Sequence, residues 1–171
     1  MGLTMFEIRP AWEADLEAIT EIYNQAVLRT TATMDIAPKS VDDQKKWFDK
    51  HNEKVPILVA MHNEVVIGWA SLSEYSPRGG YANTAEISIY IHENYHQKGY
   101  GKKILQEILK IGRDSGFHSI IARISADSQI SLHLFETLGF QYVGTLKEVG
   151  RKFDRFLDVV IMQLIFHEAQ K

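Results

Sequence analysis

The chain has 171 residues, of which 45% are hydrophobic and 24% are charged, so its composition is globular and its length corresponds to about one domain. It contains no cysteine, which excludes a disulfide framework, a thiolate metal site and a cysteine nucleophile. The formal net charge of −3 argues against a nucleic-acid binder that relies on a general positive field. Apolar runs fall short of the roughly 20 residues that cross a bilayer, and the first residues lack a leader pattern. We therefore expect one domain over 1–171, cytoplasmic, bound neither to a membrane nor to nucleic acid.

Hydrophobic spacing predicts strands and helices along the whole chain. Ser40, followed by two aspartates, is typical of a helix start with a hydroxyl cap. The segment 84–124 should form a parallel strand pair with a right-handed crossover, so we expect an α/β (α+β) fold in which a mixed sheet carries helices on its faces. In chain order, the expected elements are a strand at 6–9, a helix at 14–28, a helix from Ser40 to about 51, hairpin strands at 57–61 and 65–70, a strand at 84–91, a helix at 104–115, a strand at 119–124, a helix at 130–138, and strands at 142–147 and 157–165.

A turn containing two glycines separates the strand at 84–91 from the next helix. It reads Gln97-Lys98-Gly99-Tyr100-Gly101-Lys102, and glycine allows both a positive φ and a close approach of the backbone to a ligand. The first N–H groups of a helix lack internal partners and carry partial positive charge. The turn therefore predicts an anion site suited to a pyrophosphate, with an ordinary turn before a helix as the alternative.

Two familiar nucleotide loops do not fit this turn. A P-loop anchored on Gly101-Lys102 needs glycine at position 96 and Ser or Thr at position 103, where the chain has His96 and Lys103. A dinucleotide fingerprint needs a third glycine at position 104, where the chain has Ile104. The expected pyrophosphate therefore belongs to another kind of ligand.

The motif His96-Gln97-Lys98-Gly99-Tyr100-Gly101, placed after a strand, resembles the acetyl-CoA site of the GNAT N-acetyltransferase superfamily, whose usual Gln or Arg is here His96. The element order is similar as well. The resemblance implies a GNAT-like mixed, mostly antiparallel sheet with helices on both faces and a central parallel strand pair, with acetyl-CoA as the acetyl donor and no metal. The stretches that resemble, more closely, the branch of phosphinothricin and methionine sulfoximine/sulfone N-acetyltransferases are 31–34, Tyr81 with 84–86, 131–140, 143–146, 148–150, 152–153, 157–158 and 162–164.

His92-Glu93-Asn94-Tyr95-His96 spells the His-Glu-x-x-His signature of zinc proteases. That chemistry needs both histidines on one face of a helix, whereas this pentapeptide joins a strand to a glycine turn. Lys102 stands where the extended pattern needs a third histidine. We therefore expect no zinc site, and we interpret the remaining histidines, among them His51, as surface or structural residues.

Amine acetylation needs a base for the amine proton and polarisation of the thioester oxygen. Glu86 lies on the strand that leads into the glycine turn, between the apolar residues Ala85 and Ile87. The resemblance places the catalytic glutamate of the family at this position. The alternative is a solvated acid on the face of a strand.

The resemblance assigns the pantetheine arm of the cofactor to the strand backbone and its diphosphate to the glycine turn. Two positions depart from the family pattern, because Phe135 stands where many relatives have a Tyr or His proposed to protonate the thiolate, and Ser128 stands where Asn is usual. Phe135 cannot transfer a proton, so either water does or the thiolate leaves unprotonated, which a thiol pKa near ~8.5 allows. The expected cofactor residues are Ile89, Tyr90, Ile91, Gln97, Lys98, Gly99, Tyr100, Gly101, Lys102, Ser128 and Ser131.

The segment before Glu86 is expected to bind the acceptor. Arg78 can hold a carboxylate through two parallel hydrogen bonds, which suits an acceptor with a free α-carboxylate, while a solvated loop charge is the alternative. The resemblance also implies a homodimer, with 30–35 and Lys152-Phe153 near the interface. The expected substrate residues are Tyr75, Arg78, Tyr81, Asn83 and Thr84.

Together these patterns predict an acetyl-CoA-dependent enzyme that acetylates the amine of a small amino-acid-like acceptor of the phosphinothricin or methionine sulfoximine type. Transfer should be direct, since no cysteine is available for a covalent intermediate. Two alternatives remain. A protein N-terminal or lysine acetyltransferase would need an open peptide groove. A non-catalytic acyl-CoA-binding module would bind the cofactor without transferring its acetyl group.

Overall fold

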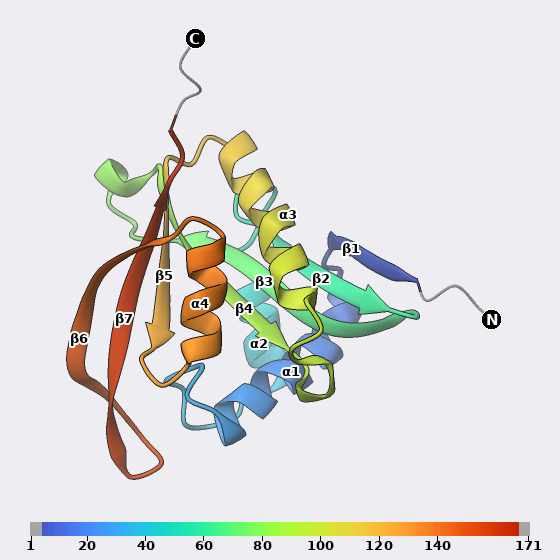
Figure 1. Ribbon diagram of the computed structural model, residues 1–171. Helices are drawn as coiled ribbons and strands as arrows, with labels where there is room; N and C mark the ends of the chain where they lie inside the picture. Colours follow the sequence, from blue (N-terminus) through green and yellow to red (C-terminus); the bar gives the residue numbers. More distant parts are fainter. Residues whose placement is uncertain (1–4, 168–171) are drawn as a thin grey trace.

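The computed structural model describes residues 5–167. Within this range, strands form one sheet of seven in the order β1-β2-β3-β4-β5-β7-β6 (Figure 1). Neighbouring strands are antiparallel except β4 and β5, which are parallel. The elements are β1 (Phe6–Pro10), η1 (Glu13–Asp15), α1 (Leu16–Arg29), α2 (Val41–Phe48), β2 (Ile57–His62), β3 (Val65–Glu74), η2 (Gly79–Tyr81), β4 (Thr84–Ile91), η3 (Glu93–Tyr95), α3 (Tyr100–Asp114), β5 (Ser119–Ser125), α4 (Gln129–Thr137), β6 (Gln141–Lys152) and β7 (Arg155–Ile165).

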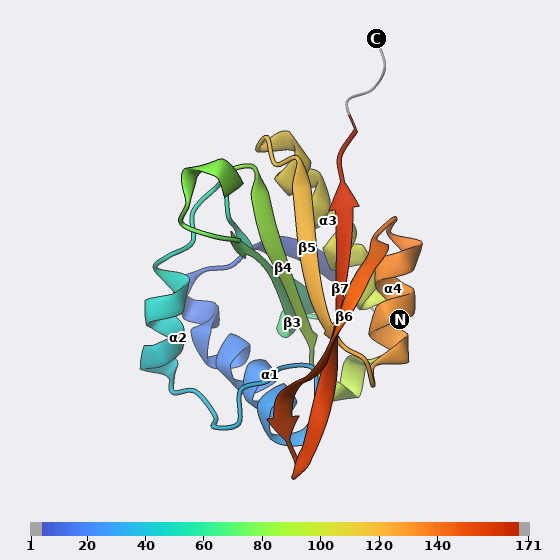
Figure 2. The same cartoon turned by 90° about the vertical axis from the view of Figure 1, so that its left-hand side faces the viewer.

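Helices cover both faces of the sheet, with α1 and α2 on one side and α3 and α4 on the other (Figures 1 and 2). Each helix packs through an apolar stripe. In α3, Ile104 and Ile108 are fully buried in the larger core cluster, which also contains Phe135 of α4. In α1, Ile19 and Ile22 pack in a second cluster with Trp69 of β3. The predicted fold, a mixed sheet between two helical layers with one parallel pair, is confirmed.

Local sequence signals determine where several elements begin and end. Ser40 Oγ accepts a hydrogen bond from the Asp43 N–H at 3.1 Å, and the Asp43 carboxylate accepts one from the Ser40 N–H at 3.2 Å, so the predicted start of α2 is confirmed. The turn between β2 and β3 has φ values of 48° at Asn63 and 67° at Glu64, as a two-residue hairpin of type I′ requires.

Two strands run further than predicted. The hairpin strand expected at 65–70 extends to Glu74, and the strand expected at 142–147 extends to Lys152. Register shifts interrupt the pairing of β6 with β7, one of them between Leu146 and Gly150. A bulge adds a residue to one strand and so breaks the period-two pattern, which is why the spacing of apolar residues did not predict the full length of β6.

The parallel ladder between β4 and β5 is short. Its Cα partners are Thr84 with Ser119, Ala85 with Ile120, and Glu86 with Ile121. Among the described residues the ladder ends at that third pair, although β4 runs on to Ile91 and β5 to Ser125. The two strands then separate, as their arrowheads show in Figure 1. We call the point at Glu86 and Ile121 the β4–β5 fork.

In the part of the chain that the structure describes, helices are too short or too polar to span a membrane.

Candidate active site

A carboxylate stands at the β4–β5 fork. The side chain of Glu86 points toward the α1–α2 face, because side chains alternate along a strand and those of Ala85 and Ile87 are buried in the opposite core. Arg123 of β5 lies on the same face, with its Nη2 atom 3.5 Å from Glu86 Oε2. The position predicted for a general base therefore holds a partly exposed carboxylate beside a guanidinium.

Beyond the fork, one edge of β4 faces away from β3. The His92 N–H donates to a β3 carbonyl at 2.8 Å, and backbone groups alternate in direction along an antiparallel strand. Ile89 and Ile91 therefore direct their backbone groups toward the fork side, and Tyr90 directs its own toward β3. The Ile91 carbonyl already accepts a hydrogen bond from His96 Nε2 at 2.7 Å. This contact explains how a histidine fits where the resemblance gives Gln or Arg.

The glycine turn forms the start of α3. Gly99 is the N-cap residue with φ of 81°, and no side chain caps the helix, so its first N–H groups are available to an anion. A Cβ at Gly99 would meet no atom within 4 Å, whereas a Cβ at Gly101 would touch Leu134 at 3.5 Å. Gln97 also has a positive φ of 58°. The outer side of the turn at Gly99 therefore faces open space.

The other predicted residues of the turn have different surroundings. Lys98 Nζ donates to the Asn94 carbonyl of η3 at 2.9 Å and lies over the Tyr95 ring. Lys102 is exposed. The Tyr100 ring stacks on Phe6, with ring centroids 5.0 Å apart. The side chain of Tyr100 therefore serves packing, and only its backbone can contribute to an anion site.

Both histidines of the His-Glu-x-x-His sequence at 92–96 make local contacts. His92 caps η3 by accepting a hydrogen bond from the Asn94 N–H at 3.2 Å, and His96 holds the Ile91 carbonyl. The two histidines flank a single 3-10 turn instead of one face of an α-helix. Between residues 5 and 167, groups of three or more His, Cys, Asp or Glu side chains that could hold a metal ion are absent.

The start of α4 carries two hydroxyl groups, whereas its buried face is aromatic. Ser128 Oγ donates to Ser131 Oγ at 2.8 Å, so the two hydroxyls predicted to contact the cofactor lie together. Phe135 is buried and packs edge-on against Phe140, with ring centroids 4.9 Å apart. Phe135 is therefore a core residue, and α4 offers no proton donor at that position.

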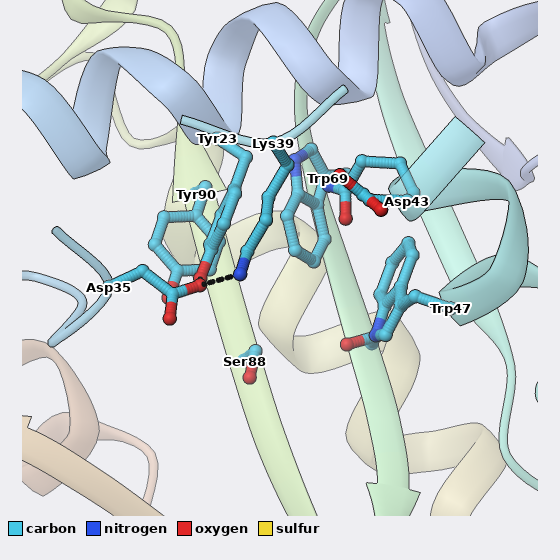
Figure 3. Close-up of a pocket in the computed structure, with 10 residues that line it drawn as sticks. Tyr23, Asp35, Lys39, Asp43, Trp47, Trp69, Ser88 and Tyr90 are labelled. Atoms are coloured by element: carbon cyan, nitrogen blue, oxygen red, sulfur yellow. Dashed lines mark hydrogen bonds and ion pairs between the residues drawn. The ribbon is translucent and has the colours of Figure 1, made fainter. Parts of the chain in front are cut away.

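A cavity of about 470 Å³ lies between the sheet and the α1–α2 side (Figure 3). Ser88 and Tyr90 line it from the same face of β4 that carries Glu86, and their register partners Ser71 and Trp69 line it from β3. We call it the aromatic pocket. Its lining residues are Tyr23, Asp35, Lys39, Asp43, Gln44, Trp47, Trp69, Ser71, Ser88 and Tyr90.

The polar groups of the aromatic pocket are partly paired with one another. Lys39 Nζ lies 3.1 Å from Asp35 Oδ2, and the Tyr23 hydroxyl donates to the same carboxylate at 2.7 Å. Burial alone would raise the pKa of Asp35, but the hydrogen bonds from Tyr23 and Lys39 outweigh it and hold that pKa below its usual value. Burial raises the pKa of Tyr90 to about 12, so this phenol stays neutral. Trp69 Nε1 is buried without a hydrogen-bond partner among the described residues.

The loop that brings Asp35 and Lys39 to the pocket is fastened to β6. The side chain of Lys152 is buried and donates to the Thr33 carbonyl at 2.8 Å, and burial lowers the pKa of its ammonium group. A Cβ on Gly150 would lie 2.6 Å from Met34 Sδ. The loop and the end of β6 are therefore in close contact.

A second cavity of about 510 Å³ adjoins the first. Trp47 lines both. Ser73, which lines the second, is the register partner of Glu86, so the fork lies between the two cavities along the sheet. His51 also lines it, and its Nε2 lies 3.4 Å from Ser73 Oγ.

The predicted substrate residues lie in different surroundings, and only some of them border a cavity. Tyr81 and Thr84 line the second cavity, and Tyr75 packs against Tyr81 with ring centroids 5.4 Å apart. Arg78 is exposed at the start of η2. The Asn83 carbonyl accepts hydrogen bonds from the backbone of the segment that enters β5, so its backbone has a structural role.

Sequence reasoning missed most of the aromatic pocket. Trp47 falls within the helix predicted from Ser40 to about 51, Trp69 falls within the hairpin strand predicted at 65–70, and neither is among the predicted site residues. Lys39 was not singled out, since only the folded loop brings it near the sheet. Arg123 was missed because it is a lone charge in an otherwise apolar strand. The available signal was the alternation of polar Glu86 and Ser88 with apolar neighbours, which marks one face of β4 as something other than core.

Comparison with known proteins agrees with this arrangement. The profile of the acetyltransferase (GNAT) domain matches residues 8–161. The chain therefore belongs to the GNAT acetyltransferase family, as the resemblance implied, and its enzyme class is that of an N-acetyltransferase.

Individual relatives cover almost the whole chain. The L-amino acid N-acyltransferase of Escherichia coli is 40% identical over 162 residues, which are 94% of this chain and 94% of that protein. The L-methionine sulfoximine/L-methionine sulfone acetyltransferase of Salmonella typhimurium is 37% identical, covering 94% and 95%. A solved acetyltransferase structure from Salmonella typhimurium, with its cofactor acetyl-CoA, superposes with a TM-score of 0.92 at 36% identity, covering 98% of this chain and 97% of that one. These matches confirm the predicted branch of the family.

Proposed function

We propose that the whole chain, 1–171, is one domain that transfers an acetyl group from acetyl-CoA directly to the amine of a small amino-acid-like acceptor of the phosphinothricin or methionine sulfoximine type. The observation that carries the proposal is the β4–β5 fork. Glu86 lies at its last pair, just before the free edge of β4 begins, and shares the face of β4 from which Ser88 and Tyr90 line the aromatic pocket. The relatives named for such acceptors support the substrate class.

In this proposal the cofactor lies along the edge of β4 that faces away from β3, beyond the β4–β5 fork, and ends at the glycine turn. The backbone groups of Ile89 and the N–H of Ile91 pair with the pantetheine arm, since they would otherwise lack partners on that side. The free N–H groups at the start of α3, from Gly99 onward, hold the diphosphate. Ser128 and Ser131 lie at the start of α4, beside the end of β5, and contact the arm from there.

The proposed chemistry is a direct displacement. The neutral amine attacks the thioester carbon, so that a C–N bond forms and the C–S bond breaks. Glu86 takes the amine proton, directly or through water, and the electron pair of the broken bond leaves on the CoA sulfur. Because Phe135 is buried in the core, the thiolate leaves as such or takes a proton from water, which a thiol pKa near ~8.5 permits.

The acceptor is proposed to lie on the α1–α2 face, with its amine at Glu86 and its side chain in the aromatic pocket. The walls of Trp47, Trp69 and Tyr90 suit apolar atoms, and Lys39 can donate to side-chain oxygens. The segment 75–84 borders the second cavity and completes the acceptor site. A cavity of this size lined by aromatic rings fits a small molecule better than an extended peptide.

We also propose that the protein works in the cytoplasm as a homodimer. The β6–β7 hairpin forms the edge of the sheet and exposes a row of apolar side chains, which in a monomer would remain in water. Light scattering should report two chains per particle, and Phe156→Glu should give monomers, while Val65→Glu in the β2–β3 hairpin should not. Exposed apolar residues of the hairpin include Val143, Leu146, Val149, Phe153 and Phe156.

The test is acetyl transfer measured as thiol release with a panel of amines that includes phosphinothricin, methionine sulfoximine, methionine sulfone and peptides. We expect transfer to the amino acids, and Glu86→Gln should lower kcat by roughly 10²- to 10⁴-fold, as expected for the loss of a general base, while calorimetry shows that the variant still binds acetyl-CoA. Glu107→Gln, on the exposed face of α3, is the control. Binding of acetyl-CoA without transfer to any amine would favour a non-catalytic module, and transfer to peptides alone would favour a protein acetyltransferase.

A further inference from the structure

A guanidinium with few partners stands beside the candidate base. Arg123 lies on β5, two residues beyond Ile121 in the last pair of the β4–β5 ladder, and its side chain is 52% exposed. Its Nη2 atom is 3.5 Å from Glu86 Oε2, and no hydrogen bond joins the two side chains in the described part of the chain. The pair is close enough to attract but too loose to occupy the donors of the guanidinium.

Another ion pair in the same protein shows what a closed contact looks like. Arg9 donates two hydrogen bonds to Asp15, at 2.7 Å and 2.9 Å, and both side chains are largely buried. This is the bidentate geometry that guanidinium and carboxylate prefer. Arg123 and Glu86 do not adopt this geometry, so the N–H donors of the Arg123 guanidinium remain available for another carboxylate.

The chemistry of an amino acid specifies where such a cation must lie. Amine and carboxylate are bonded to the same carbon, so the nitrogen and a carboxylate oxygen lie only roughly 3 Å apart. A base that takes the amine proton and a cation that holds the carboxylate must therefore be immediate neighbours. Glu86 and Arg123 are neighbours on one face of the sheet, and their two charges mirror those of a zwitterion.

We infer that Arg123 binds the α-carboxylate of the acceptor while Glu86 receives the proton of its amine, so that the site selects free α-amino acids. This inference rests on the proposed function and extends it. An amine with no carboxylate beside it, such as a peptide N-terminus, a lysine side chain or an amino-acid amide, leaves the guanidinium unpaired. Arg78, the cation that the sequence suggested for this role, lies on an exposed loop at the start of η2.

The experiment compares L-methionine sulfone with its α-carboxamide, which has the same amine and side chain but no negative charge. The measured quantity is the ratio of kcat/KM for the acid to kcat/KM for the amide. In Arg123→Gln this ratio should fall by roughly tenfold to a hundredfold, mostly through KM of the acid, because a charge-assisted contact is lost. Arg123→Lys should restore part of the ratio, since an ammonium supplies the positive charge without the planar arrangement of donors in a guanidinium.

Two matched variants complete the design. Arg113→Gln removes an exposed arginine of α3 that is paired with Asp114 and should leave the ratio unchanged. Arg78→Gln tests the cation that the sequence suggested, and its effect should be smaller than that of Arg123→Gln. Calorimetry with acetyl-CoA on each variant confirms that it is folded.

The outcomes separate this inference from the proposed function. A wild-type protein that acetylates no amine overturns both. A wild-type protein that acetylates amines, but whose ratio falls less than about threefold in Arg123→Gln or falls further in Arg78→Gln, overturns only the role of Arg123. A tenfold fall that Arg123→Lys partly restores supports it, because removal of a purely structural contact would lower activity on acid and amide alike.

Discussion

His51 lies edge-on to Trp47, with ring centroids 4.6 Å apart, and its Nδ1 donates to the Trp47 carbonyl at 2.8 Å. A carbonyl only accepts, so the proton of the neutral ring is on Nδ1 and Nε2 is left as an acceptor facing Ser73. Burial lowers the pKa of this imidazole below its ordinary value. The second cavity is therefore lined by a histidine that is neutral at physiological pH.

This histidine should make the protein sensitive to acid. The unfolded chain binds a proton on His51 near pH ~6.5, whereas the folded protein binds it only at a lower pH. The contribution of His51 to stability is thus complete above pH ~6.5 and is lost as the pH falls through the folded pKa. Chemical unfolding should show that the free energy of unfolding falls less from pH 7 to pH 5 in His51→Gln than in the wild type. His133→Gln, on the exposed side of α4, should keep the wild-type dependence, and parallel curves for His51→Gln and wild type would contradict the assignment.

Gly99→Ala should weaken cofactor binding and stability together. The φ of 81° at this residue is disfavoured by a Cβ at a cost of roughly 1–2 kcal/mol, and a shift of the turn would displace the N–H groups at the start of α3. We expect a lower melting temperature and a several-fold larger Kd for acetyl-CoA by calorimetry. Gly79→Ala, which also meets no atom within 4 Å but has no positive φ, is the control and should change neither.

Trp47→Ala should impair acceptor binding selectively. The indole is the wall shared by both cavities, so its removal merges them and takes away an apolar contact surface. We expect KM for the acceptor to rise about tenfold or more, equivalent to ~1.4 kcal/mol or more, with KM for acetyl-CoA unchanged. Trp12→Ala removes an exposed indole elsewhere, and equal effects of the two variants on KM would speak against an acceptor site at Trp47.

Gly150→Ala and Gly144→Ala form a matched pair on β6. At Gly150 a Cβ would lie 2.6 Å from Met34 Sδ, whereas at Gly144 it would meet no atom within 4 Å. The Met34 side chain must shift in the first variant, and we expect the loop that carries Asp35 to shift with it. Steady-state kinetics should show a higher KM for the acceptor in Gly150→Ala only. An unchanged KM would mean that the methionine side chain alone absorbs the change.

The sequence was most informative where local chemistry decides the structure. The cap at Ser40, the turn at 63–64 and the glycine turn at 97–102 each follow from backbone rules that act over a few residues, and the structure contains all three. The position of Glu86 on one face of a strand followed from simple alternation.

The remaining parts of the site depend on contacts between distant segments. Arg123 meets Glu86 only because β5 lies beside β4 in the sheet. Lys39 reaches the aromatic pocket because the loop after α1 folds back, with both backbone groups of Lys39 hydrogen-bonded to the Asn24 side chain and the Thr33 carbonyl held by Lys152 of β6. Spacing within one segment contains no information about such pairs, so these residues could not be predicted without the folded chain.

The attachment of this loop to the end of β6 has an evolutionary consequence. We expect substitutions at Gly150 or Lys152 of β6 to displace a lining segment of the pocket without altering any residue of its walls. Descendants of this protein can thus change their acceptor preference through substitutions outside the pocket, and two paralogues with identical pocket residues need not share a preferred amine.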